Sequence, residues 1–296
     1  MLKLYHAPNS VCSQKARVGL SEKGLSFESV VLDLAAGDQF KPAYRRLNPN
    51  AVVPKLVDDG KVVIESSIII QYLDDLAAAP RLMPDGAYPA AHVRHWLLRS
   101  LEIHASVNSL SFATAYRLGL MKLPREEREE IYRRIPDPAR ADKRRDLVEK
   151  GVASSHVDEA IRAFARVFRD MDADLAAGGP WLMGAQYTLA DVNLIAYIDR
   201  LDRLGLSGFG VPAIPRSVNG WSVRARAQAT KRRLRRLSRQ RLCPQCVQPA
   251  PKRGRSSRAN SPPDGLPAAK KPAKPAIQAA GIPAFFCNPD AFYRSA

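Results

Sequence analysis

Residues 53–66 constrain the fold of this chain more than any other stretch. After Val53-Pro54, two short runs rich in β-branched residues are separated by Asp59-Gly60. This pattern predicts a tight β-hairpin, because glycine accepts the positive φ that two-residue turns require. Pro54 stands at the entry of the first strand, where its missing N–H costs no ladder hydrogen bond. The backbone here is expected to offer one free polar edge, and a cis Val53-Pro54 bond would direct that edge outward.

The hairpin is predicted to lead directly into a helix. Glu65 and Ser66 precede an apolar run that begins at Ile68. Hydroxyls and unpaired N–H groups at a helix N-terminus attract a carboxylate. The stretch therefore predicts a site for an extended peptide, whose backbone pairs with the strand edge and whose carboxylate lies at the helix start.

The surrounding residues complete a small α/β unit. Alternating residues 2–6 and 27–32 predict two strands. Residues 12–23, which end at Gly24, and residues 42–47 predict helices. A parallel strand pair joined by a helix, followed by an antiparallel hairpin, predicts a four-stranded mixed sheet with helices on its faces.

Helical periodicity dominates beyond a proline-rich linker around residues 80–89. The expected helices cover residues 88–119, 125–133, 141–150, 154–177, 188–204 and 221–229. Thr188 is the expected N-cap of the fifth helix, with Asp191 as its acidic partner in a variant of the capping box. We expect an α/β domain at 1–80, an all-helical domain at 88–230 and a basic Pro/Ala/Lys-rich tail at 231–296, mostly disordered.

The positive charge of the chain is concentrated at its C-terminal end. From Ser217 onward there are 17 Lys and Arg against 2 Asp and Glu, a net charge of +15, whereas residues 1–216 carry +2. A nucleic-acid partner would therefore depend on the tail alone. Electrostatic binding to nucleic acid or an acidic surface is one interpretation of the tail. A solvated tether and the translation of a shifted reading frame are two others, and both are favoured over the first.

Composition and cysteine placement exclude several classes of protein. No apolar run is long enough to cross a membrane, and no secretory signal begins the sequence. Four cysteines, three of them in the tail, do not form a disulfide framework, so we expect a cytoplasmic protein. Cys243 and Cys246 supply only half of a zinc pattern, and no metal is expected.

Residues 1–230 resemble bacterial cytosolic glutathione S-transferases, especially the theta/zeta-like and β-etherase-like branches. The residues that carry the resemblance are Asn9-Ser10-Val11-Cys12-Ser13, Asn48-Pro49, Val53-Pro54, Asp59-Gly60, Glu65-Ser66 and Thr188-Leu189-Ala190-Asp191. The resemblance implies a thioredoxin-like N-terminal domain and an all-α C-terminal domain. It also implies glutathione as co-substrate, a small hydrophobic electrophile as second substrate, a role in detoxification, and a homodimer.

Glutathione must react as a thiolate, although a free thiol has a pKa of about 8.5. One hydrogen bond to the charged sulfur, worth roughly 1.5–3 kcal/mol, lowers that pKa by about one to two units. The resemblance implies that Ser10 donates this bond; its alternative role is ordinary turn chemistry. Cys12 is the second candidate and could form a mixed disulfide with glutathione, or be a small buried hydrophobe. Ser13 either donates in place of Ser10 or caps the helix.

The resemblance also implies how glutathione is held. The backbone of Val53-Pro54 pairs with the cysteinyl part. Ser66 takes the γ-glutamyl carboxylate and Glu65 the ammonium group, a role compatible with simple helix capping. At the glycine end, Gln39 occupies a position where relatives have a polar contact, and Lys41 is nearby.

The electrophile is expected between the two domains, against the first long helix of the helical half. His104, Phe112 and Tyr116 are the candidates by position, and core packing is their alternative role. The sequence as a whole predicts a glutathione S-transferase. The alternatives are a glutathione-disulfide enzyme that uses Cys12 and a non-catalytic relative that acts through protein contacts.

Overall fold

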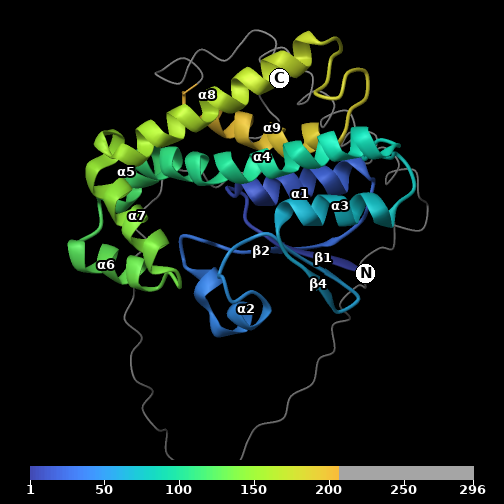
Figure 1. Ribbon diagram of the computed structural model, residues 1–296. Helices are drawn as coiled ribbons and strands as arrows, with labels where there is room; N and C mark the ends of the chain where they lie inside the picture. Colours follow the sequence, from blue (N-terminus) through green and yellow to red (C-terminus); the bar gives the residue numbers. More distant parts are fainter. Residues whose placement is uncertain (207–296) are drawn as a thin grey trace, which may run out of the picture.

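The computed structural model describes residues 1–206; the predicted helix at 221–229 and the predicted tail lie outside the described residues. A small sheet with one helix on its outer side and two on its inner side forms the N-terminal half (Figure 1). The two inner helices separate the sheet from a layer of long helices. This is the expected architecture, a thioredoxin-like unit joined to a helical half.

The sheet has the predicted mixed topology, with strand order β2-β1-β3-β4. β1 pairs with β2 in parallel, whereas β3 is antiparallel to both β1 and β4. The hairpin turn is confirmed by the positive φ angles of Asp59 (44°) and Gly60 (85°). The elements of this half are β1 Leu2–His6, α1 Val11–Glu22, β2 Glu28–Val31, η1 Asp38–Phe40, α2 Pro42–Leu47, β3 Lys55–Asp58, β4 Lys61–Val63 and α3 Ser66–Leu76.

The helical half follows the predicted order of helices with one local difference. The first long helix is interrupted by a turn of π-helix, which apolar periodicity alone did not predict. The elements are α4 Ala87–Ser111, η2 Phe112–Tyr116 (the π turn), α5 Arg117–Leu120, α6 Arg125–Arg133, α7 Pro138–Lys150, η3 Gly151–Ala153, α8 Ser155–Ala176 and α9 Leu189–Arg203.

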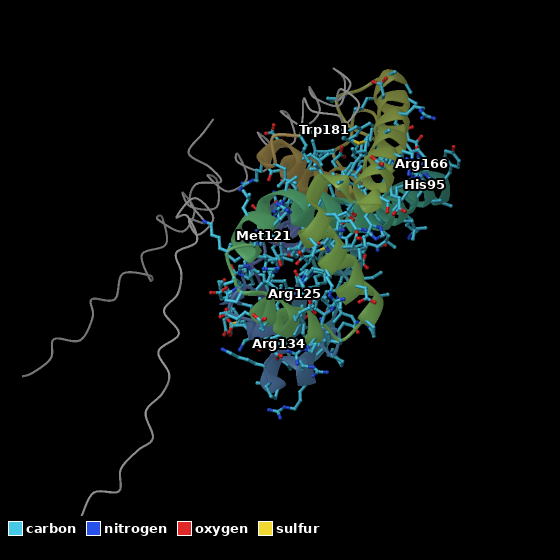
Figure 2. All side chains as sticks on the ribbon, turned by 90° about the vertical axis from the view of Figure 1, so that its left-hand side faces the viewer. His95, Met121, Arg125, Arg134, Arg166 and Trp181 are labelled. Carbon is cyan, nitrogen blue, oxygen red and sulfur yellow. The ribbon has the colours of Figure 1, made fainter. Side chains whose placement is uncertain are left out.

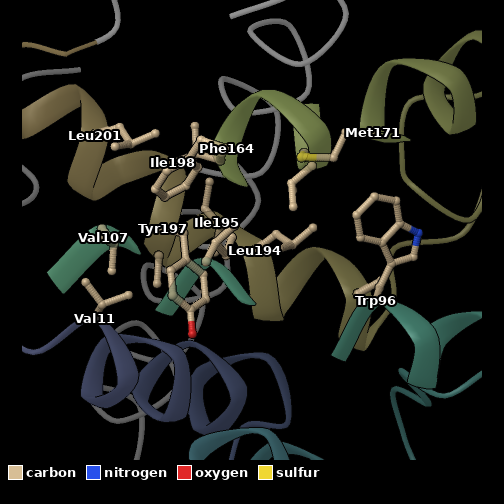
Figure 3. Packing of buried hydrophobic residues seen from close by; sticks show 14 of the residues in the cluster. Val11, Trp96, Val107, Phe164, Met171, Leu194, Ile195, Tyr197, Ile198 and Leu201 are labelled. Carbon is tan, nitrogen blue, oxygen red and sulfur yellow. The ribbon is translucent and has the colours of Figure 1, made fainter. Parts of the chain in front are cut away.

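Helices α1 and α3 belong to both of the larger hydrophobic cores of residues 1–206. Their inner faces pack on the sheet around Leu4, Leu56 and Ile69, which are fully buried. Their outer faces meet the larger core formed by α4, α8 and α9 (Figure 1). In that core, Tyr197 directs its hydroxyl toward α1 (Figure 3). Buried apolar surface therefore continues from the sheet into the helical half.

The N-terminus of α9 is the expected capping box. Thr188 accepts a hydrogen bond from the N–H of Ala190, and the Asp191 carboxylate accepts one from the N–H of Thr188 (2.9 Å). The same carboxylate also accepts from the N–H of Leu182 (3.1 Å) and is fully buried. Asp191 is therefore a structural residue that joins the loop before α9 to the helix.

The far end of the helical half contacts the N-terminal half a second time. Arg134, which follows α6, lies against the loop around Gly37, and its guanidinium is 5.1 Å from the Phe40 ring (Figure 2).

Among residues 1–206, no helix has the length and apolar character needed to cross a lipid bilayer.

Candidate functional site

Three segments of the chain meet at one end of the sheet. β1 and β3 are antiparallel, and Tyr5 opposite Lys55 is their last pair, so the turn after β1 lies beside Val53-Pro54. β3 and β4 are also antiparallel, with Leu56 opposite Val63, which brings the start of α3 to the same end. Strand pairing therefore places three predicted site residues, Ser10, Val53 and Ser66, at the same end of the sheet.

Val53 presents its backbone at this end of the sheet. The Val53-Pro54 bond is cis. The preceding carbonyl, that of Val52, accepts hydrogen bonds from the hydroxyl of Tyr44 (2.6 Å) and from Nδ2 of Asn48 (2.9 Å). Within residues 1–206, the backbone of Val53 itself has no hydrogen-bond partner. An extended peptide can therefore pair with Val53 along this edge.

Ser10 caps helix α1 from the turn after β1. Its half-buried hydroxyl oxygen accepts a hydrogen bond from the N–H of Ser13 (3.1 Å). An oxygen used as an acceptor still carries a hydrogen that can be donated, here beside the positive end of the helix dipole. Ser13 is fully buried, and its hydroxyl accepts from the N–H of Ala7 (3.2 Å). Of the two hydroxyl groups, that of Ser10 is therefore accessible to a ligand from solvent and that of Ser13 is not.

The start of α3 has the strained geometry of a ligand clamp. Glu65, the N-cap residue, has a φ of 64° and makes no capping hydrogen bond with its side chain. A non-glycine residue in this left-handed region is uncommon, and such strain is concentrated at binding sites. Ser66 is the first helical residue and is 7% exposed. The N–H groups of this first turn can bind the carboxylate of an α-amino acid group. The exposed Glu65 carboxylate can bind the ammonium group of the same amino acid.

Cys12, in the first turn of α1, is paired with a histidine from α4. Its Sγ lies 3.5 Å from Nδ1 of His104. Burial alone raises the pKa of the thiol, but the hydrogen bond and charge of His104, together with Lys15, lower it overall to about 6. Burial lowers the pKa of His104, but the bond and charge of Cys12 raise it overall. The pair therefore favours a thiolate beside an imidazolium.

A buried lysine lies below this pair and joins both halves of the molecule. Lys15 on α1 is 1% exposed, and burial lowers its pKa to about 8. Its Nζ donates to Oδ1 of Asn193 on α9 (2.6 Å) and to Oγ of Ser67 on α3 (3.0 Å). Sequence analysis did not select Lys15, although a lysine among the apolar positions of α1 was a visible signal.

The two residues expected at the glycine end differ in their surroundings. Gln39 is buried, and its Nε2 donates to the carbonyl of Leu34 (3.3 Å). Lys41 is largely exposed and forms an ion pair with Asp38 (2.6 Å). Their role in binding stays a prediction.

The three residues expected to face the electrophile do not form one group. His104 is paired with Cys12, whereas Phe112 and Tyr116 in the π turn stack on each other with ring centroids 4.9 Å apart. The Tyr116 hydroxyl donates to the carbonyl of Asn9 (3.4 Å) and accepts from Arg200 (3.2 Å). The aromatic pair therefore extends from the residue next to Ser10 into the helical half.

Two protein-family models match the chain. Residues 4–81 match the glutathione S-transferase N-terminal domain, and residues 154–224 match the glutathione S-transferase C-terminal domain. Within residues 1–206, no group of His, Cys, Asp and Glu is arranged to hold a metal ion.

Similar proteins of known sequence or structure cover most of the chain. Protein LigF from Sphingobium sp. (strain NBRC 103272 / SYK-6) is 31% identical over 208 residues, which are 69% of this chain and 80% of LigF. The crystal structure of this beta-etherase, 28% identical in sequence, superposes with a TM-score of 0.67 over 80% of this chain and 99% of that one. A theta-class glutathione S-transferase from Xanthomonas axonopodis pv. citri, solved with glutathione bound, is 25% identical, with a TM-score of 0.57 over 78% of this chain and 95% of its own.

Proposed function

This chain belongs to the glutathione S-transferase family, and we propose that it transfers glutathione to a hydrophobic electrophile with the hydroxyl of Ser10 stabilising the thiolate. The observation that carries the proposal is the placement of Ser10. Its half-buried hydroxyl caps α1 at the end of the sheet where Val53 and Ser66 also lie. Because the oxygen already accepts from Ser13, the hydroxyl hydrogen is the part that remains for a bound sulfur.

Glutathione fits this end of the sheet by the chemistry of its parts. The cysteinyl backbone pairs with Val53, and the γ-glutamyl carboxylate lies on the N–H groups of α3 at Ser66. The ammonium group of the same end meets the carboxylate of Glu65. Gln39 and Lys41 are our candidates for the glycine carboxylate. The sulfur then lies near Ser10, where one hydrogen bond of roughly 1.5–3 kcal/mol is enough to make it ionise near neutral pH.

The reaction is an attack of the thiolate on an electrophilic carbon. A carbon–sulfur bond forms, and a leaving group departs with its electron pair or, in an addition, the electrophile takes up a proton. LigF is a beta-etherase, which makes aryl ethers one candidate class of electrophile. Phe112 and Tyr116 are the proposed apolar contacts of this second substrate. A role in detoxification follows from this chemistry as part of the same proposal.

A second candidate activity is thiol–disulfide exchange at Cys12. The pairing of Cys12 with His104 at 3.5 Å favours it, because a thiolate is the nucleophile in such exchange. The Cys12 thiolate would attack the disulfide of oxidised glutathione, form a mixed disulfide and release one glutathione thiolate.

Single substitutions separate the two activities. Ser10→Ala should lower kcat for conjugation of chlorodinitrobenzene by about 10- to 100-fold, as expected for the loss of one hydrogen bond to a charged group. Ser10→Thr keeps both the hydroxyl and the helix cap, and should retain most of the activity. Cys12→Ala should leave conjugation within about threefold of the unsubstituted chain. A loss of conjugation in Cys12→Ala alone would transfer the catalytic role to Cys12.

We also propose the organisation of the molecule that the sequence suggested. Residues 1–80 form the glutathione-binding domain and residues 88–230 the helical domain. The protein is a homodimer in the cytoplasm. Its oligomeric state is measurable by light scattering on the purified chain.

A further inference from the structure

Arg144, in the middle of α7, is a half-buried cation without an anionic partner. Its guanidinium carbon is 4.1 Å from the Phe112 ring centroid. It forms no hydrogen bond or ion pair with any residue in 1–206. Burial and the nearby Arg140 lower its pKa to about 10, whereas the phenol groups of Tyr116 and Tyr132 oppose that change. A partly buried charge of this kind is unfavourable unless an anion accompanies it.

Two neighbouring arginines, unlike Arg144, have carboxylate partners. Arg145 contacts Glu129 (2.9 Å) and Asp142 (2.6 Å). Arg128 contacts Glu149 (3.1 Å). Glu129, Asp142 and Glu149 are therefore already paired with other arginines, and Asp146 is paired with Lys150 (2.5 Å).

Arg140, one helical turn before Arg144, adds a second cation beside it. Its terminal nitrogen donates to the carbonyl of Asn50 (3.3 Å), and its Nε is buried without a partner. Burial lowers its pKa, and Asp137 is the acid that opposes this change. The Asp137 carboxylate, however, already caps α7 by accepting from the N–H of Ala139 (3.0 Å). The carboxylate that acts on Arg140 is thus engaged elsewhere, and within residues 1–206 no carboxylate pairs with Arg144.

Contacts of Arg140 and Arg144 connect α7 to the proposed catalytic centre around Ser10 and Val53. Asn50 belongs to the loop that leads into Val53, so Arg140 reaches from α7 to the glutathione side. Arg117 donates to the carbonyl of Val148 (2.8 Å), which holds α7 beside the π turn. Phe112 and Tyr116 then form an aromatic bridge from Arg144 to Asn9, next to Ser10.

We propose that the electrophile is an aromatic compound with a carboxylate, and that Arg144, assisted by Arg140, binds this carboxylate. The inference rests on the proposed function and names the substrate class of the same site. The ring lies on Phe112 and Tyr116 with its reacting carbon near Ser10, and the carboxylate lies at the far end. Arginine suits this role because its planar guanidinium can donate two hydrogen bonds to one carboxylate.

Two matched electrophiles test the proposal. Chlorodinitrobenzene and chlorodinitrobenzoate react in the same way: the glutathione sulfur bonds to the ring carbon, chloride leaves with the bonding electrons, and the thiol proton passes to solvent. Each kcat/KM is divided by the rate constant of the uncatalysed reaction with free glutathione, so that intrinsic reactivity cancels. The full chain should accelerate the benzoate more than the neutral compound by about tenfold or more.

Substitutions on α7 assign the preference to one side chain. Arg144→Gln should lower kcat/KM for the benzoate by about 10- to 100-fold and that for the neutral compound by less than about threefold. Lys143→Gln removes one positive charge from the same helix and should change neither value by more than about twofold. Arg144→Lys should recover part of the benzoate rate, since it keeps the charge but not the fork. Melting temperatures of all variants report on folding.

A binding measurement keeps this inference separate from the proposed function. Dinitrobenzoate and dinitrobenzene, which lack a leaving group, are titrated into the chain in the presence of S-methylglutathione. Binding of the benzoate that weakens about tenfold or more in Arg144→Gln supports the inference, even if neither chlorinated compound is conjugated and the proposed function fails. Equal affinity for both compounds, or equal loss of both in Arg144→Gln, overturns it.

Discussion

Cys12 and Ser10 lie two positions apart at the start of α1, but their surroundings give them different chemistry. Ser10 is held by the backbone of its own helix through Ser13, whereas Cys12 is held by His104, which is 92 residues away in the sequence. The serine offers a hydrogen to a bound sulfur. The cysteine is itself prepared as a thiolate.

The ionisation of Cys12 can be measured directly. With a pKa of about 6, roughly nine-tenths of Cys12 should be thiolate at pH 7, against a few per cent for an ordinary cysteine with a pKa of about 8.5. The rate of its alkylation by iodoacetamide should therefore rise through about pH 6 and level off above pH 7. Mass spectrometry of the peptide that contains Cys12 distinguishes it from the other cysteines.

The partner residue provides the control for this measurement. His104→Asn removes the imidazolium, so the midpoint of alkylation should move upward by one unit or more. A midpoint near pH 8.5 in both the unsubstituted chain and the variant would show that His104 does not ionise Cys12.

Site residues carried by local motifs were accessible from the sequence, and those made by long-range packing were not. The hairpin turn at Asp59-Gly60 was predicted from a few neighbouring residues and is confirmed by their positive φ angles. The Cys12–His104 contact and the burial of Lys15 depend on how α1 meets α4 and α9, which no local pattern encodes. His104 was selected only for its position on the first long helix.

At the scale of elements, the capping box of α9 connects a sequence motif to the stability of the helical half. Asp191 satisfies the N–H groups of Thr188 and Leu182 in a fully buried place. Helix α9 packs on α1, α3 and α4, so a loss of order at its N-terminus should weaken its packing against all three helices.

Asp191→Ala should lower the free energy of unfolding by about 2–4 kcal/mol, since it removes a helix cap and leaves two buried donors unpaired. Thermal unfolding by circular dichroism measures the loss. Asp191→Asn keeps one acceptor oxygen and should lose less. A change below about 0.5 kcal/mol in Asp191→Ala would contradict the structural role assigned to this carboxylate.

The elements themselves were largely predictable, and the exception has a physical cause. Helices α6 and α9 begin within a residue of their predicted starts, because each has a turn or capping signal before it. The π turn at Phe112–Tyr116 was missed. One extra residue in a helical turn leaves the apolar pattern almost unchanged, although it redirects the Phe112 and Tyr116 side chains.

At the scale of the whole molecule, the two halves act as one body because α1 and α3 belong to both cores (Figure 1). The polar network around Lys15 lies at the same junction and joins α1, α3 and α9. The glutathione end of the proposed site belongs to the sheet, whereas Arg144 and the aromatic bridge belong to the helices. Specificity for the electrophile can therefore change without altering the part that binds glutathione.

Calorimetric titration of glutathione into the full chain, into residues 1–230 and into Ser66→Ala measures directly whether this end of the sheet binds glutathione. We expect a saturable heat with a Kd below about 1 mM for the first two, agreeing within about twofold. Ser66→Ala should bind about tenfold more weakly, because one contact to the γ-glutamyl carboxylate is lost. No saturable heat at millimolar glutathione in the full chain would show that glutathione does not bind there.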